Sequence, residues 1–229
     1  MIATGHPIVL TLVLSIGLLQ PVHGSGTAAE QQQPDECKEV HVAYELAGGE
    51  DSLFVVTVPR AGALRFLGTT HTIEFRTLRG NLCWHEETPE SSKLNLWIST
   101  ADLDVTEGET LARRRESVRQ EAVGSEVLDA KAYPDIHYSS TEFTPLDNQR
   151  WMITGELSIR EVTRHFKVEA QLRFAEPGKL VATGAFSLRP EVFGIPPVTA
   201  LGGSVRTDET IHLEFSIRGR KSTRETMTP

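Results

Sequence analysis

The stretch VTRHFKVEAQLRF, Val162 to Phe174, decides the fold of this chain. Its even-numbered positions are apolar apart from Arg164, and its odd-numbered positions are all polar or charged. Successive side chains of a β-strand point to opposite faces, so this period of two predicts a strand with one dry face and one wet face.

The same alternation recurs on both sides of this stretch. We expect further strands at residues 40–46, 53–58, 71–77, 94–99, 136–143, 151–159, 180–188 and 211–218. Turn-forming residues separate several of these runs, as at 47–51, 144–148 and 176–178. One helical segment is expected from about Leu111 to Leu128, with Gly124 kinking or ending it.

One helix cannot cover so many one-sided strands, which leaves a β-sandwich or a closed barrel. We favour an all-β fold, an antiparallel barrel of about eight strands, because closure removes exposed strand edges.

The composition excludes nucleic acid as an expected partner. The 229 residues carry a formal net charge of −8, whereas nucleic-acid binding needs a positive surface for phosphate contacts. The apolar content of 39% is enough for a buried core. The length suits one domain with short extensions.

Residues 8–19, IVLTLVLSIGLL, are the one long apolar run. As a helix they would reach about 18 Å, short of the roughly 30 Å hydrocarbon core, and they match the apolar part of a signal peptide. Cleavage is expected after Gly24 or near Ala28, and an uncleaved anchor is the alternative. We therefore divide the chain into a signal peptide (1–24), a polar leader (25–37), a barrel (38–218) and a polar tail (219–229). The mature protein is expected to be secreted or periplasmic, with no transmembrane span after cleavage.

Cys37 and Cys83 are the two cysteines. In an oxidising compartment this pair predicts a disulfide, and the other reading is two unrelated buried thiols. Neither lies in a CxxC motif, so we expect neither a zinc cluster nor a redox-active pair.

The dry faces define the candidate binding residues. An eight-stranded barrel either fills its interior with side chains or holds one slender ligand, and the residues alone leave both readings open. An open apolar lumen would suit an isoprenoid tail, because burial contributes about 25 cal/mol per Å². In that case Ala170→Trp or Gly184→Phe should block the lumen and still fold. The candidate lipid-binding residues are His71, Ile73, Phe75, Leu96, Ile98, Trp151, Ile153, Leu157, Phe166, Val168, Ala170, Leu172, Ala182, Gly184, Phe186, Leu213 and Phe215.

His71 is the one polar candidate. It is in phase with Ile73 and Phe75, so it is interpreted either as a hydrogen-bond partner for a lipid head group or as a structural histidine. The chain has no nucleophile elbow, phosphate-binding glycine loop or HExxH motif. No catalytic residue, metal ligand or cofactor is therefore assigned, apart from a bound lipid.

Five segments carry a resemblance to a known family. They are AGALRFLGTTHTI (61–73), EVLDAKAYPDIHYSS (126–140), TGELSIREVTR (154–164), GAFSLRPEVFGI (184–195) and RTDETI (206–211). In this order they resemble the YceI family of secreted, lipocalin-like polyisoprenoid-binding proteins. The resemblance covers residues 40–218 and implies an extended antiparallel barrel with a long hydrophobic pocket. Thr69 stands where some relatives have a second histidine, and Glu161 where a glycine is usual, so a two-histidine site is not carried over.

The expected function is non-catalytic binding of an isoprenoid-like or other amphiphilic lipid in the barrel lumen. One alternative is a lipid-modifying enzyme that uses His71. The other is a stress or adhesion module with a filled core that acts through its outer surface. The sequence leaves the head group, the tail length and the oligomeric state open.

Overall fold

The computed structural model describes residues 37, 42–49, 52–108, 110–175 and 177–222. All of them belong to the unit Pro34–Pro229. The expected signal peptide (1–24), the leader apart from Cys37, and the end of the tail (223–229) lie outside the described residues. Among the described residues, no helix combines the length and the apolar character needed to cross a membrane.

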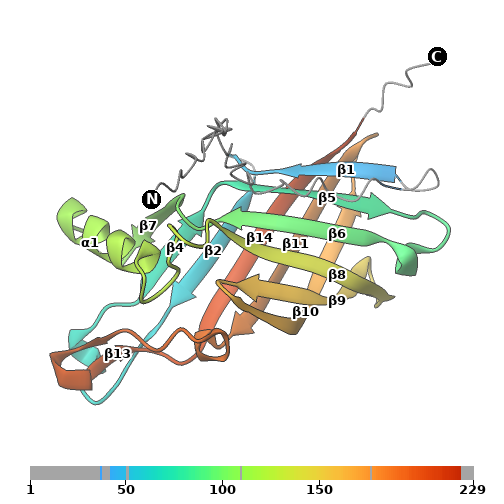
Figure 1. Ribbon diagram of the computed structural model, residues 1–229. Helices are drawn as coiled ribbons and strands as arrows, with labels where there is room; N and C mark the ends of the chain where they lie inside the picture. The colour runs from blue at the N-terminus through green and yellow to red at the C-terminus, as the bar shows by residue number, and fades with distance from the viewer. Residues whose placement is uncertain (1–36, 38–41, 50–51, 109, 176, 223–229) are drawn as a thin grey trace, which may run out of the picture. The chain divides into compact units, whose positions relative to one another are not determined.

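Strands make up most of the described chain (Figure 1). They are β1 (Val42–Ala47), β2 (Leu53–Val58), β3 (Arg60–Ala61), β4 (His71–Phe75), β5 (Leu78–Trp84), β6 (Lys93–Ser99), β7 (Leu103–Glu107), β8 (Asp135–Pro145), β9 (Arg150–Ile159), β10 (Val162–Phe174), β11 (Lys179–Leu188), β12 (Thr199–Ala200), β13 (Val205–Thr207) and β14 (Ile211–Lys221). The α-helix among the described residues is α1 (Ala112–Val123), and short 3₁₀ helices are η1 (Arg65–Leu67), η2 (Pro89–Ser91), η3 (Pro190–Phe193) and η4 (Leu201–Gly203).

Eight antiparallel strands close into a barrel. Their order is β1, β5, β6, β8, β9, β10, β11 and β14, and pairing of β1 with β14 completes the ring. The predicted antiparallel barrel of about eight strands with one helical segment is confirmed.

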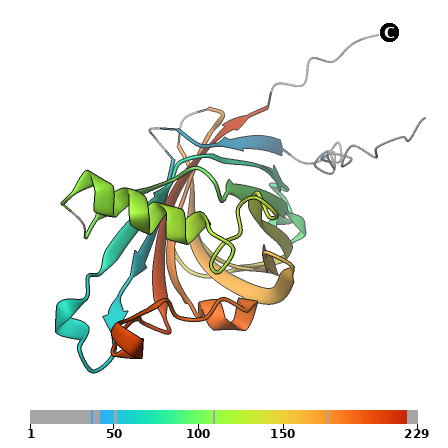
Figure 2. The ribbon, with the colours of Figure 1, turned by 60° about the vertical axis from the view of Figure 1, so that its left-hand side comes forward.

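Three of the barrel strands continue beyond the ring. β2 continues β1 and pairs with β14. β4 leads into β5 and pairs with β2, while β7 continues β6 and pairs with β4. The breaks fall at residues 48–52, 76–77 and 100–102. A Cβ at Gly48 would collide with the backbone carbonyl oxygen of Arg76, so the break needs a glycine there. Since β7 is the edge of the sheet, the barrel flares at this end, and α1 packs against β7 there (Figure 2).

Several boundaries differ from the prediction. Residues 219–221, assigned to the tail, extend β14 and pair with β1, so the tail boundary at Arg218 is three residues too early. The helix is shorter than expected, and Gly124 directly follows its last residue. β5 and β7 were not predicted. β5 lacks alternation because Leu82, Cys83 and Trp84 are all buried, although the middle one lies on the outer face.

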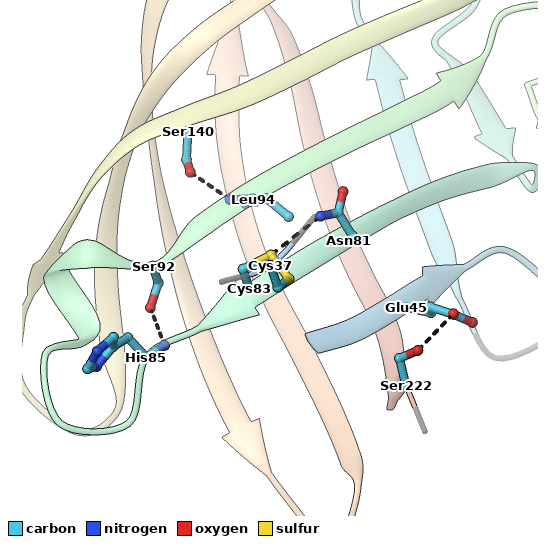
Figure 3. Close-up of a disulfide and its surroundings, with 9 residues drawn as sticks. All are labelled: Cys37, Glu45, Asn81, Cys83, His85, Ser92, Leu94, Ser140 and Ser222. Atoms are coloured by element: carbon cyan, nitrogen blue, oxygen red, sulfur yellow. Dashed lines mark hydrogen bonds between the residues drawn. A yellow bond between two sulfur atoms is a disulfide. The ribbon is translucent and has the colours of Figure 1, made fainter. Parts of the chain in front are cut away.

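A disulfide between Cys37 and Cys83 explains that burial (Figure 3). It attaches the segment before β1 to β5 and covers the outer face at Cys83, which is buried. The loop it closes spans a sequence separation of 46 residues, and the chain-entropy model assigns such a crosslink about 4 kcal/mol of stability. Beyond Cys83, the amide of His85 donates to Oγ of Ser92 at 3.0 Å and ties the turn between β5 and β6.

Candidate functional site

The barrel encloses an inner cavity of about 110 Å³. For comparison, a cavity needs about 10–15 Å³ of such volume to hold one water molecule. Its lining side chains are apolar except for the hydroxyl of Tyr138. Predicted lumen residues in this lining are Leu96, Ile98, Ile153, Leu157, Phe166, Val168, Ala170, Leu172, Ala182, Phe186, Leu213 and Phe215. The interior is therefore a hydrocarbon-lined space with room for more than water.

An outer cavity of about 150 Å³ continues the inner one toward the flared end. The two share the lining residues Phe54, Ile98, Ile136, Ile159, Leu188 and Leu213. Ile73 and Phe75 line the outer cavity from β4, as predicted lumen residues. Ala122 of α1 and the 196–198 segment complete its wall. The two cavities therefore adjoin, one in the barrel interior and one at the mouth.

The mouth has a polar rim. Glu191, Asp208 and Glu209 line the outer cavity there. Arg206 Nη1 lies 3.2 Å from Glu209 Oε1, and Arg189 Nη2 lies 3.3 Å from Glu191 Oε2 and 3.8 Å from Glu209 Oε2. These exposed pairs each stabilise the fold by at most about 1 kcal/mol. Their effect is to place charged and hydrogen-bonding groups directly above an apolar interior.

Aromatic rings close the opposite end of the barrel. Phe143 lines the inner cavity, and its ring centroid lies 6.2 Å from that of Trp84. Trp84 also packs on Trp151 and Phe174, with centroids 5.2 and 4.9 Å away. Tyr44 completes this aromatic plug, 5.5 Å from Phe174. Trp151, a predicted lumen residue, belongs to the plug and not to the lining of either cavity.

Tyr138 brings the one side-chain polar group into the inner lining. Its hydroxyl donates to the backbone carbonyl of Ile153 at 2.9 Å. The ring lies over Gly155, where a Cβ would come within 2.8 Å of Cζ. Burial raises the pKa of the Tyr138 phenol well above its ordinary value of 10. The hydroxyl is thus neutral and satisfied at physiological pH and offers neither an acid nor a base to a guest.

Comparison with known proteins adds the family. Residues 51–218 match the YceI-like domain. The chain belongs to the YceI-like family. This confirms the resemblance read from the five sequence segments.

YceI-like relatives and structures agree with the barrel. A UPF0312 protein of Pseudomonas putida is 27% identical over 155 residues, which cover 64% of this chain and 72% of the relative. The crystal structure of Burkholderia cenocepacia BcnA superimposes with a TM-score of 0.58 at 14% identity, over 73% of this chain and 95% of BcnA. A polyisoprenoid-binding domain of Saccharophagus degradans, implicated in plant cell wall breakdown, gives a TM-score of 0.55 at 10% identity, over 79% of this chain and 99% of that domain. At these identities the two structures establish the shared fold.

Besides Trp151, two predicted site residues lie apart from both cavity linings. His71 lies opposite Val58 on β2 and lines neither cavity. Its buried Nδ1 has no hydrogen-bond partner among the described residues. The ring of Phe215 occupies the space on the lumen side of Gly184. A Cβ at residue 184 would lie 2.5 Å from Cζ of Phe215. Because this space is already occupied, Gly184→Phe is now expected to destabilise the fold, as it would in a packed core.

Other lining residues were absent from the prediction. Ile159, Leu180, Leu188 and Ile217 continue the alternation of predicted strands, so the pattern itself could have found them. Leu82 lies on β5, where the alternation is lost.

Proposed function

We propose that this YceI-like protein binds one isoprenoid-like lipid, with the tail in the barrel and the head group at the rim. The observation that carries the proposal is the apolar inner cavity, which adjoins an outer cavity with a charged rim. The description of the Saccharophagus degradans neighbour as polyisoprenoid-binding supports the same ligand class.

The tail supplies most of the binding free energy in this proposal. Burial of one CH₂ group contributes about 0.8 kcal/mol, so a five-carbon isoprene unit contributes at most about 4 kcal/mol. Affinity should therefore rise with each isoprene unit until the two cavities are full. The aromatic plug sets that limit, because it closes the barrel beside Phe143, which lines the inner cavity.

The rim favours a head group that donates hydrogen bonds. Glu191, Asp208 and Glu209 present carboxylate oxygens, while Arg189 and Arg206 face the carboxylates. A hydroxyl or an amide fits such a rim without the repulsion that a phosphate would meet.

We also propose that the protein catalyses no reaction and that it lies outside the cytoplasm. Absence of catalysis is supported by the satisfied hydroxyl of Tyr138 and by the position of His71 outside both linings. Export is supported by residues 8–19 and by the disulfide. Fractionation and N-terminal sequencing should find a mature chain that begins after Gly24 or near Ala28.

Native mass spectrometry of the purified protein is the direct test of the ligand. A co-purifying apolar molecule should dissociate into organic solvent, and added isoprenols should bind more tightly as their length increases. His71→Ala should bind as the wild type does. A protein that stays empty and binds no isoprenoid alcohol or quinone would contradict the proposal, and loss of lipid turnover in His71→Ala would favour the enzyme instead.

A further inference from the structure

Two segments at the mouth form a projection whose tip extends beyond the lipid-binding cavities, which we name the arm; only its base lines the outer cavity. It comprises residues 59–70 and 196–207, joined where Arg206 of β13 pairs with Ala61 of β3. The amide of Leu64 donates to the carbonyl of Ser204 at 2.9 Å. Gly62 has a φ of +95°, and a Cβ there would lie 2.6 Å from that same carbonyl oxygen, so the close approach requires glycine. The arm extends from the end of the barrel that carries α1 (Figures 1 and 2).

The tip of the arm is apolar and exposed. Phe66, Leu67 and Leu201 are 69%, 61% and 65% exposed. They lie on η1 and η4, which both contact β13. Leu201 has a φ of +50°, which L residues rarely adopt. Three large apolar side chains at one tip are more than scattered surface residues would give.

The charge of the arm is opposite to that of the protein. Its two segments contain Arg60, Arg65 and Arg206 and no aspartate or glutamate, in a chain of net charge −8. Arg206 pairs with Glu209 just beyond the second segment, so Arg60 and Arg65 carry the positive charge of the arm. Arg60 donates to the carbonyl of Gly68 at 2.6 Å, which fixes it within the arm. Arg65 is exposed at the tip, next to Phe66. Exposed apolar side chains flanked by arginines are the combination that binds the interface of an anionic bilayer.

We propose that the arm docks on the surface of an anionic lipid membrane, with Phe66, Leu67 and Leu201 inserted among the head groups. The residues at the base of the arm, Val198 and Thr207, line the outer cavity. Docking of the tip therefore brings the mouth near the membrane surface, while the carboxylates of the rim oppose closer contact with anionic head groups. The inference goes beyond lipid binding in the lumen, because the arm contacts the membrane whatever the lumen holds.

A fluorophore on the arm tests the proposal in the full chain. Ala200→Cys places a thiol beside Leu201 at an exposed position, and Leu146→Cys places one at the 42%-exposed control site between β8 and β9, at the plugged end. Cys37 and Cys83 are bonded to each other and do not compete for the label. With vesicles of phosphatidylglycerol and phosphatidylcholine, we expect blue-shifted emission and quenching by bilayer-embedded quenchers at position 200 only. Each label reports its own position, so vesicle binding through residues 8–19 does not mimic the result.

Variants then separate the contributions. Combined Phe66→Ser, Leu67→Ser and Leu201→Ser should weaken vesicle partitioning of the position-200 label at least about tenfold, whereas Leu146→Ser should leave it unchanged. Ala182→Phe in the lumen should also leave it unchanged, which keeps this test independent of lumen binding.

Three results would overturn the inference. One is aqueous emission at position 200 on vesicles, or an equal shift at position 146. Another is a shift that needs no vesicles and grows with protein concentration, which would make the tip an interface between two copies. The third is equal docking on phosphatidylcholine alone, which would remove the role of the arginines.

Discussion

Ala182→Phe should narrow the lumen while the barrel still folds. Ala182 lines the inner cavity and is half-buried, so we expect an added ring to extend into the cavity. Ala170 lines the same cavity from the neighbouring strand but is 2% exposed. Ala170→Phe is the matched control, because the same ring must there displace packed neighbours.

The magnitudes follow from the size of the ring. A phenyl group occupies about the space of one five-carbon isoprene unit, whose burial contributes at most about 4 kcal/mol. Its exclusion corresponds to a loss of up to about 10³-fold in affinity. The tail can shift toward the mouth, so we expect a loss between about tenfold and 10³-fold. Ala170→Phe should instead lower the free energy of unfolding by about 1–3 kcal/mol through overpacking, and Ala182→Phe should lower it less.

Isoprenol titration and denaturant unfolding of both variants provide the assay. Unchanged affinity in Ala182→Phe would show that the tail does not occupy the inner cavity. Equal destabilisation of the two variants would show that the space in front of Ala182 is not open. Either result would refute the reasoning.

Three further predictions concern stability. Replacing Cys37 and Cys83 by serine should lower the free energy of unfolding by up to about 4 kcal/mol, and reductant should lower Tm only in the wild type; a reductant-insensitive wild type would contradict this. Because burial raises the pKa of Tyr138 above its ordinary value of 10, the stability of the protonated phenol is present below pH 10 and is lost as pH rises beyond it. In an absorbance titration, the phenol of Tyr138 should ionise only with alkaline unfolding, so Tyr138→Phe should reduce the change in absorbance at the unfolding step by one tyrosine; an unchanged step in Tyr138→Phe would refute it. Gly184→Ala should destabilise by about 1–3 kcal/mol, because its Cβ meets the ring of Phe215; calorimetry that finds wild-type Tm would contradict it.

The alternation of apolar and polar residues was enough to predict the barrel, because each one-sided strand has to bury the same face. It failed at β5, where the disulfide covers Cys83 on the outer face and removes the polar half of the pattern. Without β5, Trp84 was missed, and with it the plug that moves Trp151 out of the lining.

The sequence could not predict how each lumen-facing residue is packed against its neighbours. Ala170, Ala182 and Gly184 are equivalent small residues in the pattern, yet one is packed, one is half-buried and one is covered by Phe215. His71 shows the same limit, since its phase matches that of Ile73 but its side chain lies outside both linings. These differences depend on contacts between distant strands, which a period of two does not encode.

The plug of Trp84 and its neighbours makes the barrel a pocket that is closed at one end and not a pore that is open at both. In the proposed binding mode, an elongated ligand therefore enters and leaves through the same opening, so uptake and release are the same step in opposite directions. The protein by itself then sets no direction for ligand transfer. The ligand moves from the donor or acceptor in which its concentration is higher to the one in which it is lower, whenever the mouth meets either.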